Sequence, residues 1–228
     1  MHVRWAVTLM AAAVCCAGVA HAADPSGGEL IEKFLKASGG KEKLAAVKSR
    51  VDTGSFMLVD MGMEASYVNT VAPPNSLMAL DFGGQVVKNG VTDGTAWSVN
   101  PFQGNSKTET DNEPQIFPTL GLIDAIPVAK NLGEEEVEGA ACYKVETPNP
   151  EGGTLTFWFD KETGLLSKSL DGNSITTVLG DYKEVDGVTI AHKVAQSGGE
   201  LNFEITIAKV EIDADVDDST FEIPAEVK

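Results

Sequence analysis

The sequence predicts a mainly β protein with a small α component, built around one antiparallel sheet of about eleven strands. Apolar and polar residues alternate with a period of two over most of residues 51–212, which is typical of strands with one buried and one solvated face. Asp93-Gly94 and Asp186-Gly187 separate such segments, and Asp-Gly favours tight hairpin turns because both residues adopt positive φ at low cost. Strands joined by hairpins are antiparallel.

Residues 1–22 have the features of a cleaved export signal. After a short polar start, residues 6–19 are almost wholly apolar, and residues 20–22 read Ala-His-Ala, which fits an A-x-A cleavage site. The apolar run is shorter than the ~20 residues that a membrane span needs. The alternative is a lipoprotein signal acylated at Cys15 or Cys16. We expect a periplasmic protein, or one exported to the cell exterior.

Composition narrows the classes of partner. The formal net charge is −17 at pH 7, with 34 acidic against 17 basic residues, which argues against nucleic acid and anionic membrane surfaces as partners. Two of the three cysteines lie in the signal segment, so no intramolecular disulfide is expected. Cys142 is expected to be a buried, inert thiol. Residues 23–228 are expected to form a single, monomeric domain.

Two helices are predicted ahead of the strands. Ser26 and Glu29 have the spacing of a helix capping box, and an apolar stripe at helical spacing follows until Gly39-Gly40 ends the helix. A second, shorter helix is predicted through Lys48. From residue 50 the period changes to two. The predicted strands are 51–59, 63–71, 76–82, 86–92, 95–100, 141–147, 153–159, 165–170, 174–183, 188–195 and 200–212.

Residues 101–140 interrupt this pattern. They are polar first, then apolar and irregular, and prolines at 114, 118 and 127 limit any helix to a short one. A connection this long in a compact β domain is usually functional or disordered, and its apolar half argues against disorder. The acidic run at 134–138 is expected to be solvated and to precede a strand. We predict a mobile lid, with a fixed plug as the alternative. The lid side chains are Phe117, Leu120, Leu122 and Ile123.

The hairpin strand before this excursion carries a large aromatic residue. Trp97 and Val99 share one face of the strand, and Pro101 forces the chain to leave the sheet because proline cannot donate to a ladder. Trp97 is interpreted first as an ordinary core aromatic and, as the alternative, as a wall of a ligand cavity, and on that alternative it is counted among the candidate cavity residues. Phe102 then acts either as a hinge plug or as a simple anchor.

Several motifs along the chain occur in a recognisable order. They are Pro74-Asn75 before a strand, Asp93-Gly94 followed by Trp97 and Asn100-Pro101-Phe102, and a Phe-Glu-Ile-Pro ending at 221–224. This order resembles the LolA/LolB-like outer-membrane lipoprotein-sorting (lipoprotein carrier) superfamily. The resemblance implies a half-open antiparallel β-barrel with helices covering its concave face. It also implies a cavity that holds the acyl chains of a lipoprotein during transit.

One position departs from the pattern of this superfamily. Its lipoprotein carriers have a functionally important Arg immediately before the Pro-Asn, where this chain has Pro73. The resemblance therefore supports a lipid-carrying role more firmly than it supports lipoprotein as cargo.

Residues able to carry chemistry form no recognisable catalytic or metal motif. The sequence has no G-x-S-x-G elbow, no P-loop and no G-x-G-x-x-G fingerprint, and His192 has no Cys partner nearby. The acidic residues at 213–218 lack the Gly and Glu of an EF-hand, which would stand at 218 and 224. We therefore expect no enzymatic activity, no metal and no cofactor.

These observations predict a periplasmic carrier that binds a lipid or an acylated, lipoprotein-like ligand in an apolar cavity for transport through the cell envelope. The expected partners are this ligand and a membrane-bound donor or acceptor protein. The alternative is a non-catalytic envelope interaction protein with the same fold and a fully packed core. The candidate cavity residues are Met63, Tyr67, Met78, Leu80, Phe82, Trp97, Val99, Phe102, Tyr143, Phe157 and Phe159, together with Phe203 and Ile205 on the same predicted face.

Overall fold

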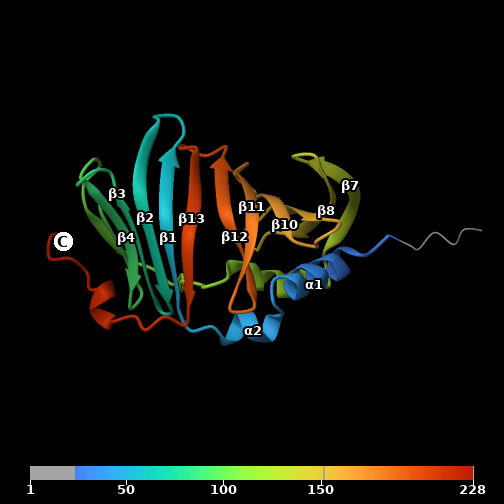
Figure 1. Cartoon of the computed structure of the whole chain (residues 1–228), viewed down its shortest axis with the longest axis horizontal. Helices are drawn as coiled ribbons and strands as arrows, with labels where there is room; N and C mark the ends of the chain where they lie inside the picture. The colour runs from blue at the N-terminus through green and yellow to red at the C-terminus, as the bar shows by residue number, and fades with distance from the viewer. Residues whose placement is uncertain (1–23, 151, 228) are drawn as a thin grey trace, which may run out of the picture.

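The structure, a computed structural model, describes residues 24–150 and 152–227. Thirteen strands form one antiparallel sheet in the order β6-β5-β4-β3-β2-β1-β13-β12-β11-β10-β9-β8-β7 (Figure 1). In the described part of the chain, β6 and β7 are the two edges and do not pair with each other, so the sheet stays open. This confirms the predicted half-open antiparallel architecture. The predicted export signal, residues 1–22, lies outside the described residues.

The predicted strands are all present within a few residues of their expected ends. The strands are β1 (Arg50–Leu58), β2 (Met63–Ala72), β3 (Asn75–Asp81), β4 (Val86–Thr92), β5 (Thr95–Val99), β6 (Ser106–Glu109), β7 (Lys130–Val137), β8 (Ala140–Pro148), β9 (Thr154–Asp160), β10 (Leu166–Leu170), β11 (Thr176–Val185), β12 (Val188–Ser197) and β13 (Phe203–Ile212). The two additional strands, β6 and β7, lie inside the segment that was expected to be irregular.

The glutamates of the acidic run at residues 134–138 are exposed and the run precedes the strand β8, as predicted, but it also lies largely within a strand that was not predicted, β7. Lys144 on β8 and Lys161 in the turn after β9 offset the clustered charge of this strand. Lys144 Nζ is 3.0 Å from Glu135 Oε2, and Lys161 forms an ion pair with Glu134. Opposite charges facing each other across an antiparallel pair stabilise it.

Helix α1 (Gly27–Ala37) begins at the predicted capping box. The Ser26 hydroxyl accepts a hydrogen bond from the Glu29 backbone N–H, and the Glu29 carboxylate accepts one from the Ser26 N–H at 2.7 Å. Helix α2 (Lys41–Ala46) ends earlier than predicted, because the Lys48 N–H donates to Asp213 Oδ1 at 2.7 Å instead of continuing the helix. The buried apolar stripe of α1 consists of Leu30, Ile31, Phe34 and Leu35.

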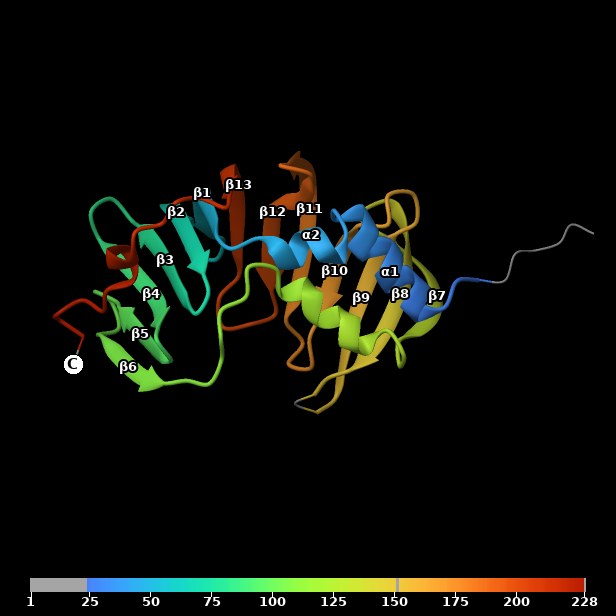
Figure 2. The ribbon, with the colours of Figure 1, turned by 90° about the horizontal axis from the view of Figure 1, so that it is seen from below.

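The covers lie on one half of the sheet. Seen from below in Figure 2, α1, α2 and the 3-10 helix η1 (Pro118–Ala125) lie next to one another across strands β8–β12. Their apolar residues pack with those of the concave face in one hydrophobic core. None of the helices in the described part of the chain has both the length and the apolar character of a membrane span.

The length of the connection between β6 and β7 follows from the topology of the sheet. β6 and β7 follow one another in the sequence but form opposite edges of the sheet. Residues 110–129 therefore cross from one edge to the other, and they do so over the open side of the sheet, carrying η1 (Figure 2). An apolar segment is needed there because one of its sides packs on α1 and the core.

The register places Trp97 and Val99 on the convex face, so the prediction that they share the concave face is wrong. Leu80 belongs to the concave core. Trp97 pairs with Gly90, and Gly90 pairs with Leu77. Leu77 and Leu80 are three residues apart in one strand, so they point to opposite faces. Trp97 therefore points away from the core that contains Leu80.

The convex site of Trp97 is covered by the C-terminal segment. The indole ring lies over Gly90, where an added Cβ would be 2.5 Å from the ring. Its Nε1 donates to Thr92 Oγ1 at 2.9 Å, and the Thr92 hydroxyl donates to the Phe221 carbonyl at 2.5 Å. Phe221, in the 3-10 helix η2 (Asp218–Phe221), is 2 % exposed. Trp97 thus anchors the end of the chain to β4 and β5.

We predict that Trp97→Ala lowers the free energy of unfolding by ~3–5 kcal/mol, the usual loss for a buried Trp truncated to Ala. Denaturant unfolding measures this loss. Thr92→Val is the matched variant, since it keeps the side-chain shape and removes the bridging hydroxyl, at an expected cost of ~1 kcal/mol. If Trp97 lined the concave cavity instead, its truncation would reduce binding of an apolar probe by the remaining folded protein.

Candidate functional site

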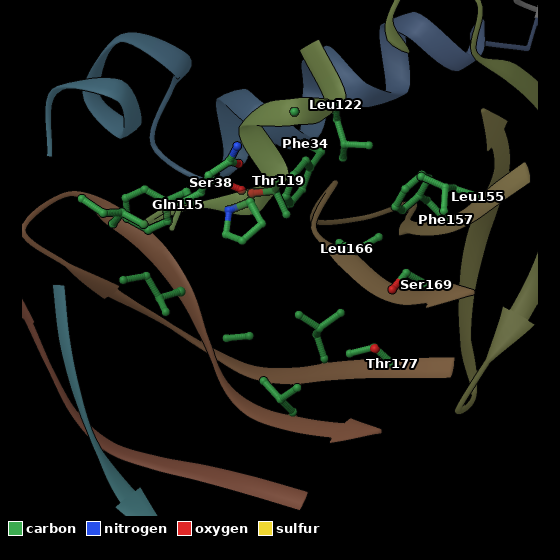
Figure 3. Close-up of a pocket in the computed structure, with 18 of the residues that line it drawn as sticks. Phe34, Ser38, Gln115, Thr119, Leu122, Leu155, Phe157, Leu166, Ser169 and Thr177 are labelled. Atoms are coloured by element: carbon green, nitrogen blue, oxygen red, sulfur yellow. The ribbon is translucent and has the colours of Figure 1, made fainter. Parts of the chain in front are cut away.

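A cavity of about 1090 Å³ lies between the concave face of the sheet and its cover (Figure 3). Ligand pockets in proteins commonly measure ~300–1,000 Å³, so this one has room for a large ligand. Phe34 of α1 and Leu122 of η1 form the cover side. The sheet side is formed mainly by β9–β13, with apolar side chains that include Leu155, Phe157, Leu166, Leu179, Ile190, Val194, Ile205 and Ile207.

The alternation of side chains along each strand, and the register between strands, determine which side chains reach this space. In β9, Leu155 and Phe157 are two residues apart and share the concave face. Ser169 pairs with both Phe157 and Thr177, which gives the wall a small polar strip between larger apolar side chains. Figure 3 shows these side chains and Leu166 projecting from β9–β11 toward the space below η1.

Some of the predicted site residues come together at this cavity and others do not. The predicted residues that line it are Tyr67, Phe117, Leu122, Phe157 and Ile205. Those that belong to the adjoining hydrophobic core are Met78, Leu80, Phe82, Leu120, Ile123, Tyr143, Phe159 and Phe203. Met63 is half-buried opposite Leu58, whereas Trp97 and Val99 lie on the convex face. Contact of any of these residues with a ligand stays a prediction.

Phe102 lies at the end of an aromatic row along one rim of the sheet. The Asn100 side-chain oxygen accepts hydrogen bonds from the backbone N–H groups of Phe102 and Gln103, at 2.9 and 3.1 Å, which turns the chain after β5. The Phe102 ring, 55 % exposed, meets the ring of Phe82 edge-on, with centroids 6.1 Å apart. Phe82 in turn contacts Phe56. Phe102 is therefore a surface anchor of this row.

The end of the segment that follows η1 is packed directly on α1. An added Cβ on Gly27 would lie 2.6 Å from the Ala129 carbonyl, and one on Gly28 would lie 2.7 Å from the Ile126 carbonyl oxygen. Only glycine permits this approach of the two backbones. The segment is thus fixed at residues 126–129, while Phe117 and Leu122, each 7 % exposed, hold its middle against the core.

A small cluster with two buried charges lies inside the mainly apolar cavity, and the sequence reasoning missed it. Arg50 and Asp52 on β1, and Asn69 on β2, line the cavity beside Tyr67. Arg50 Nε donates to Asp52 Oδ1 at 2.8 Å, and the side chains are 15 % and 4 % exposed. The guanidinium lies over the Phe117 ring, 5.6 Å from its centroid. The sequence signal was two charged residues at alternate positions on the same strand face as a core Phe.

Burial governs the protonation of this cluster. Burial raises the pKa of the Asp52 carboxyl, and the neighbouring Arg50 charge opposes that rise. Burial also raises the pKa of the Tyr67 hydroxyl, and the charge of Asp52 adds to the effect. His192 is buried nearby, with its Nδ1 3.0 Å from the Ile190 carbonyl oxygen. Among the described residues, no group of three or more His, Cys, Asp or Glu is arranged to hold a metal ion.

Comparison of the sequence with protein-family models finds no match, and comparison with curated proteins finds none either. Solved structures do match. A DUF1329 family protein from Desulfovibrio piger ATCC 29098 has a TM-score of 0.59 and 13 % identity, covering 86 % of this chain and 95 % of that one. A domain from Vibrio parahaemolyticus named for outer membrane lipoprotein sorting has a TM-score of 0.54 and 12 % identity, covering 84 % and 97 %.

A LolA superfamily protein from Nitrosomonas europaea has a TM-score of 0.53 and 11 % identity, covering 87 % of this chain and 98 % of that one. Each of these three structures is covered almost along its whole length, so the likeness is one of the whole fold and not of a single motif. The chain therefore has a LolA-like fold.

Proposed function

We propose that this protein is a periplasmic carrier, which binds a lipid or an acylated ligand in the cavity beneath α1 and η1 and transports it through the cell envelope. The observation that carries the proposal is the cavity itself, about 1090 Å³ of space between a one-sided sheet and an apolar cover. Well-packed protein interiors have few voids larger than a water molecule. A cavity of this size therefore favours a carrier over an interaction protein with a fully packed core.

The cavity wall is suited to hydrocarbon. Burial of a methylene group stabilises by ~0.8 kcal/mol, so a sixteen-carbon chain gains up to ~12 kcal/mol before the costs of ordering it and of association. Phe157, Leu166 and Ile205 are among the side chains that would contact such a chain. Tight binding thus needs no covalent chemistry.

The comparisons and the sequence support the same proposal. One protein with this fold is named for lipoprotein sorting and another for the LolA superfamily. The signal-like features of residues 1–22 fit an exported protein. Export would bring the chain to the compartment where a carrier between two membranes is needed.

Release of a ligand requires the cover to move. Residues 110–129 belong to no strand, so no ladder of the sheet holds η1 in place, and its middle depends on side-chain packing against the core. With its end fixed on α1, the segment could swing about residues 126–129. We propose that residues 117–123 form the moving part of the lid.

A bulky side chain placed in the cavity should weaken binding without harming the fold. Thr177 lines the cavity, whereas Thr176, the preceding residue in β11, points to the other face and is also half-buried. With the uncharged fluorophore N-phenyl-1-naphthylamine as probe, we expect Thr177→Phe to weaken binding roughly tenfold or more, because its ring occupies the space of several methylene groups.

Thr176→Phe is the matched control and should bind within about twofold of the wild type. Fluorescence titration measures both affinities, and thermal unfolding checks that both variants are folded. A wild type that takes up no apolar probe, or equal loss in the two variants, would contradict the carrier proposal.

Hydrogen–deuterium exchange distinguishes a lid from a plug. We expect backbone amides in η1 to exchange much faster than those of β1 in the free protein, and to slow when the apolar probe is bound, because the closed lid then gains packing. Peptide-level mass spectrometry over residues 117–125 measures this change. Exchange that is slow and insensitive to the probe would identify the segment as a fixed plug.

A further inference from the structure

We propose that the ligand of this cavity carries an anionic head group, a carboxylate or a phosphate, and that Arg50 binds it. This inference rests on the carrier function proposed above and adds the chemical class of the head group. It concerns a residue that no sequence motif singled out.

Arg50 is the one cationic side chain among the described residues that line the cavity. The other charged lining residues are Asp52, its partner, and Asp124, which is exposed on η1. The chain has 34 acidic but only 17 basic residues, so the presence of a cation in this mainly apolar cavity is not explained by a surplus of basic residues. Desolvating such a charge is costly, and replacing an ion pair of this kind by apolar residues often leaves a protein as stable or more so.

The pairing with Asp52 leaves most of the guanidinium available. A guanidinium has five N–H donors, and Asp52 Oδ1 takes the one on Nε at 2.8 Å. Among the described residues, this is the one hydrogen bond that the Arg50 side chain forms. The guanidinium carbon lies over the Phe117 ring, 5.6 Å from its centroid, and an aromatic ring is not a conventional hydrogen-bond acceptor for the remaining N–H groups. The two terminal nitrogens can therefore form a bidentate pair with a carboxylate or a phosphate.

Neighbouring polar groups complete a head-group site. Asn69 pairs directly with Asp52 across β1 and β2, and Tyr67 is two residues from Asn69 on the same face. Because burial raises the pKa of Tyr67, its hydroxyl stays protonated and can donate a hydrogen bond. A few convergent polar groups in an apolar pocket are what orients a ligand in it. The tail would then extend along the β9–β13 wall.

Asp52 has two opposite effects on anion binding at this site. Its carboxylate holds Arg50 in place through Nε but repels any anion bound to the far edge of the same guanidinium. Removing that charge while keeping an oxygen acceptor should therefore strengthen anion binding. A purely structural ion pair would show no such gain.

The test compares ligands with one tail and different heads. Hexadecanoate, hexadecyl phosphate and uncharged hexadecanol are each titrated against residues 23–228 loaded with N-phenyl-1-naphthylamine, and displacement of the fluorophore gives their affinities. We expect the wild type to bind both anions roughly tenfold or more tightly than hexadecanol. Arg50→Gln should remove this preference while leaving hexadecanol affinity within about twofold. Asp52→Asn should increase affinity for the anions several-fold and leave hexadecanol affinity unchanged.

The control variant is Lys36→Gln, which makes the same change in net charge on the exposed side of α1 and should alter no affinity. Equal effects of Arg50→Gln on all three ligands would overturn the head-group assignment, as would Asp52→Asn with no gain for the anions. Displacement of hexadecanoate by inorganic phosphate alone would identify a free anion as the ligand and overturn it too. In each case hexadecanol binding would leave the carrier proposal standing, whereas absence of all binding to the wild type would overturn both.

Discussion

The open sheet leaves one apolar face to be hidden, and most other features of the structure follow from this constraint. Thirteen strands curve without closing, so the concave face has no second sheet to pack against. The chain supplies the cover itself, from α1 at its start and from the segment that joins the two sheet edges. Gly27 and Gly28 let that segment lie directly on α1. The length of the 110–129 connection is thus a geometric requirement of the topology.

Such a cover does not fill the concave face as completely as a packed core would, and the space that remains is the candidate site. Two helices and a 3-10 turn cannot match the area of a curved sheet, so about 1090 Å³ remains between them. The space is mainly apolar, and its buried charges are those of Arg50 and Asp52. The same covering elements therefore stabilise the fold, enclose a hydrocarbon chain and bring Phe117 against the guanidinium. Stability and binding depend on the same contacts, so ligand exchange has to proceed by local movement of the cover.

Local patterns predicted the elements well, but relations between them only in part. Periodicity of two located the long strands, and the capping box located α1. β6 and β7 were missed because they are polar edge strands held by pairing and by lysine–glutamate contacts. Trp97 was assigned to the wrong face because alternation orders residues within a strand, whereas the register across a turn relates one strand to the next. Arg50 and Asp52 were overlooked because apolar and polar residues alternate only loosely in their strand. A charged residue at a position of the buried face cannot be interpreted from the sequence until its partner is known.

The central claim is that this cavity is occupied by an amphiphile in the protein's native setting. Native mass spectrometry of the protein, isolated from its own compartment without detergent, tests it most directly. The account predicts a mass excess of one amphiphile per chain, which organic solvent releases and which carries a carboxylate or a phosphate. A mass equal to that of the polypeptide alone, in a protein that also takes up no added amphiphile, would contradict it.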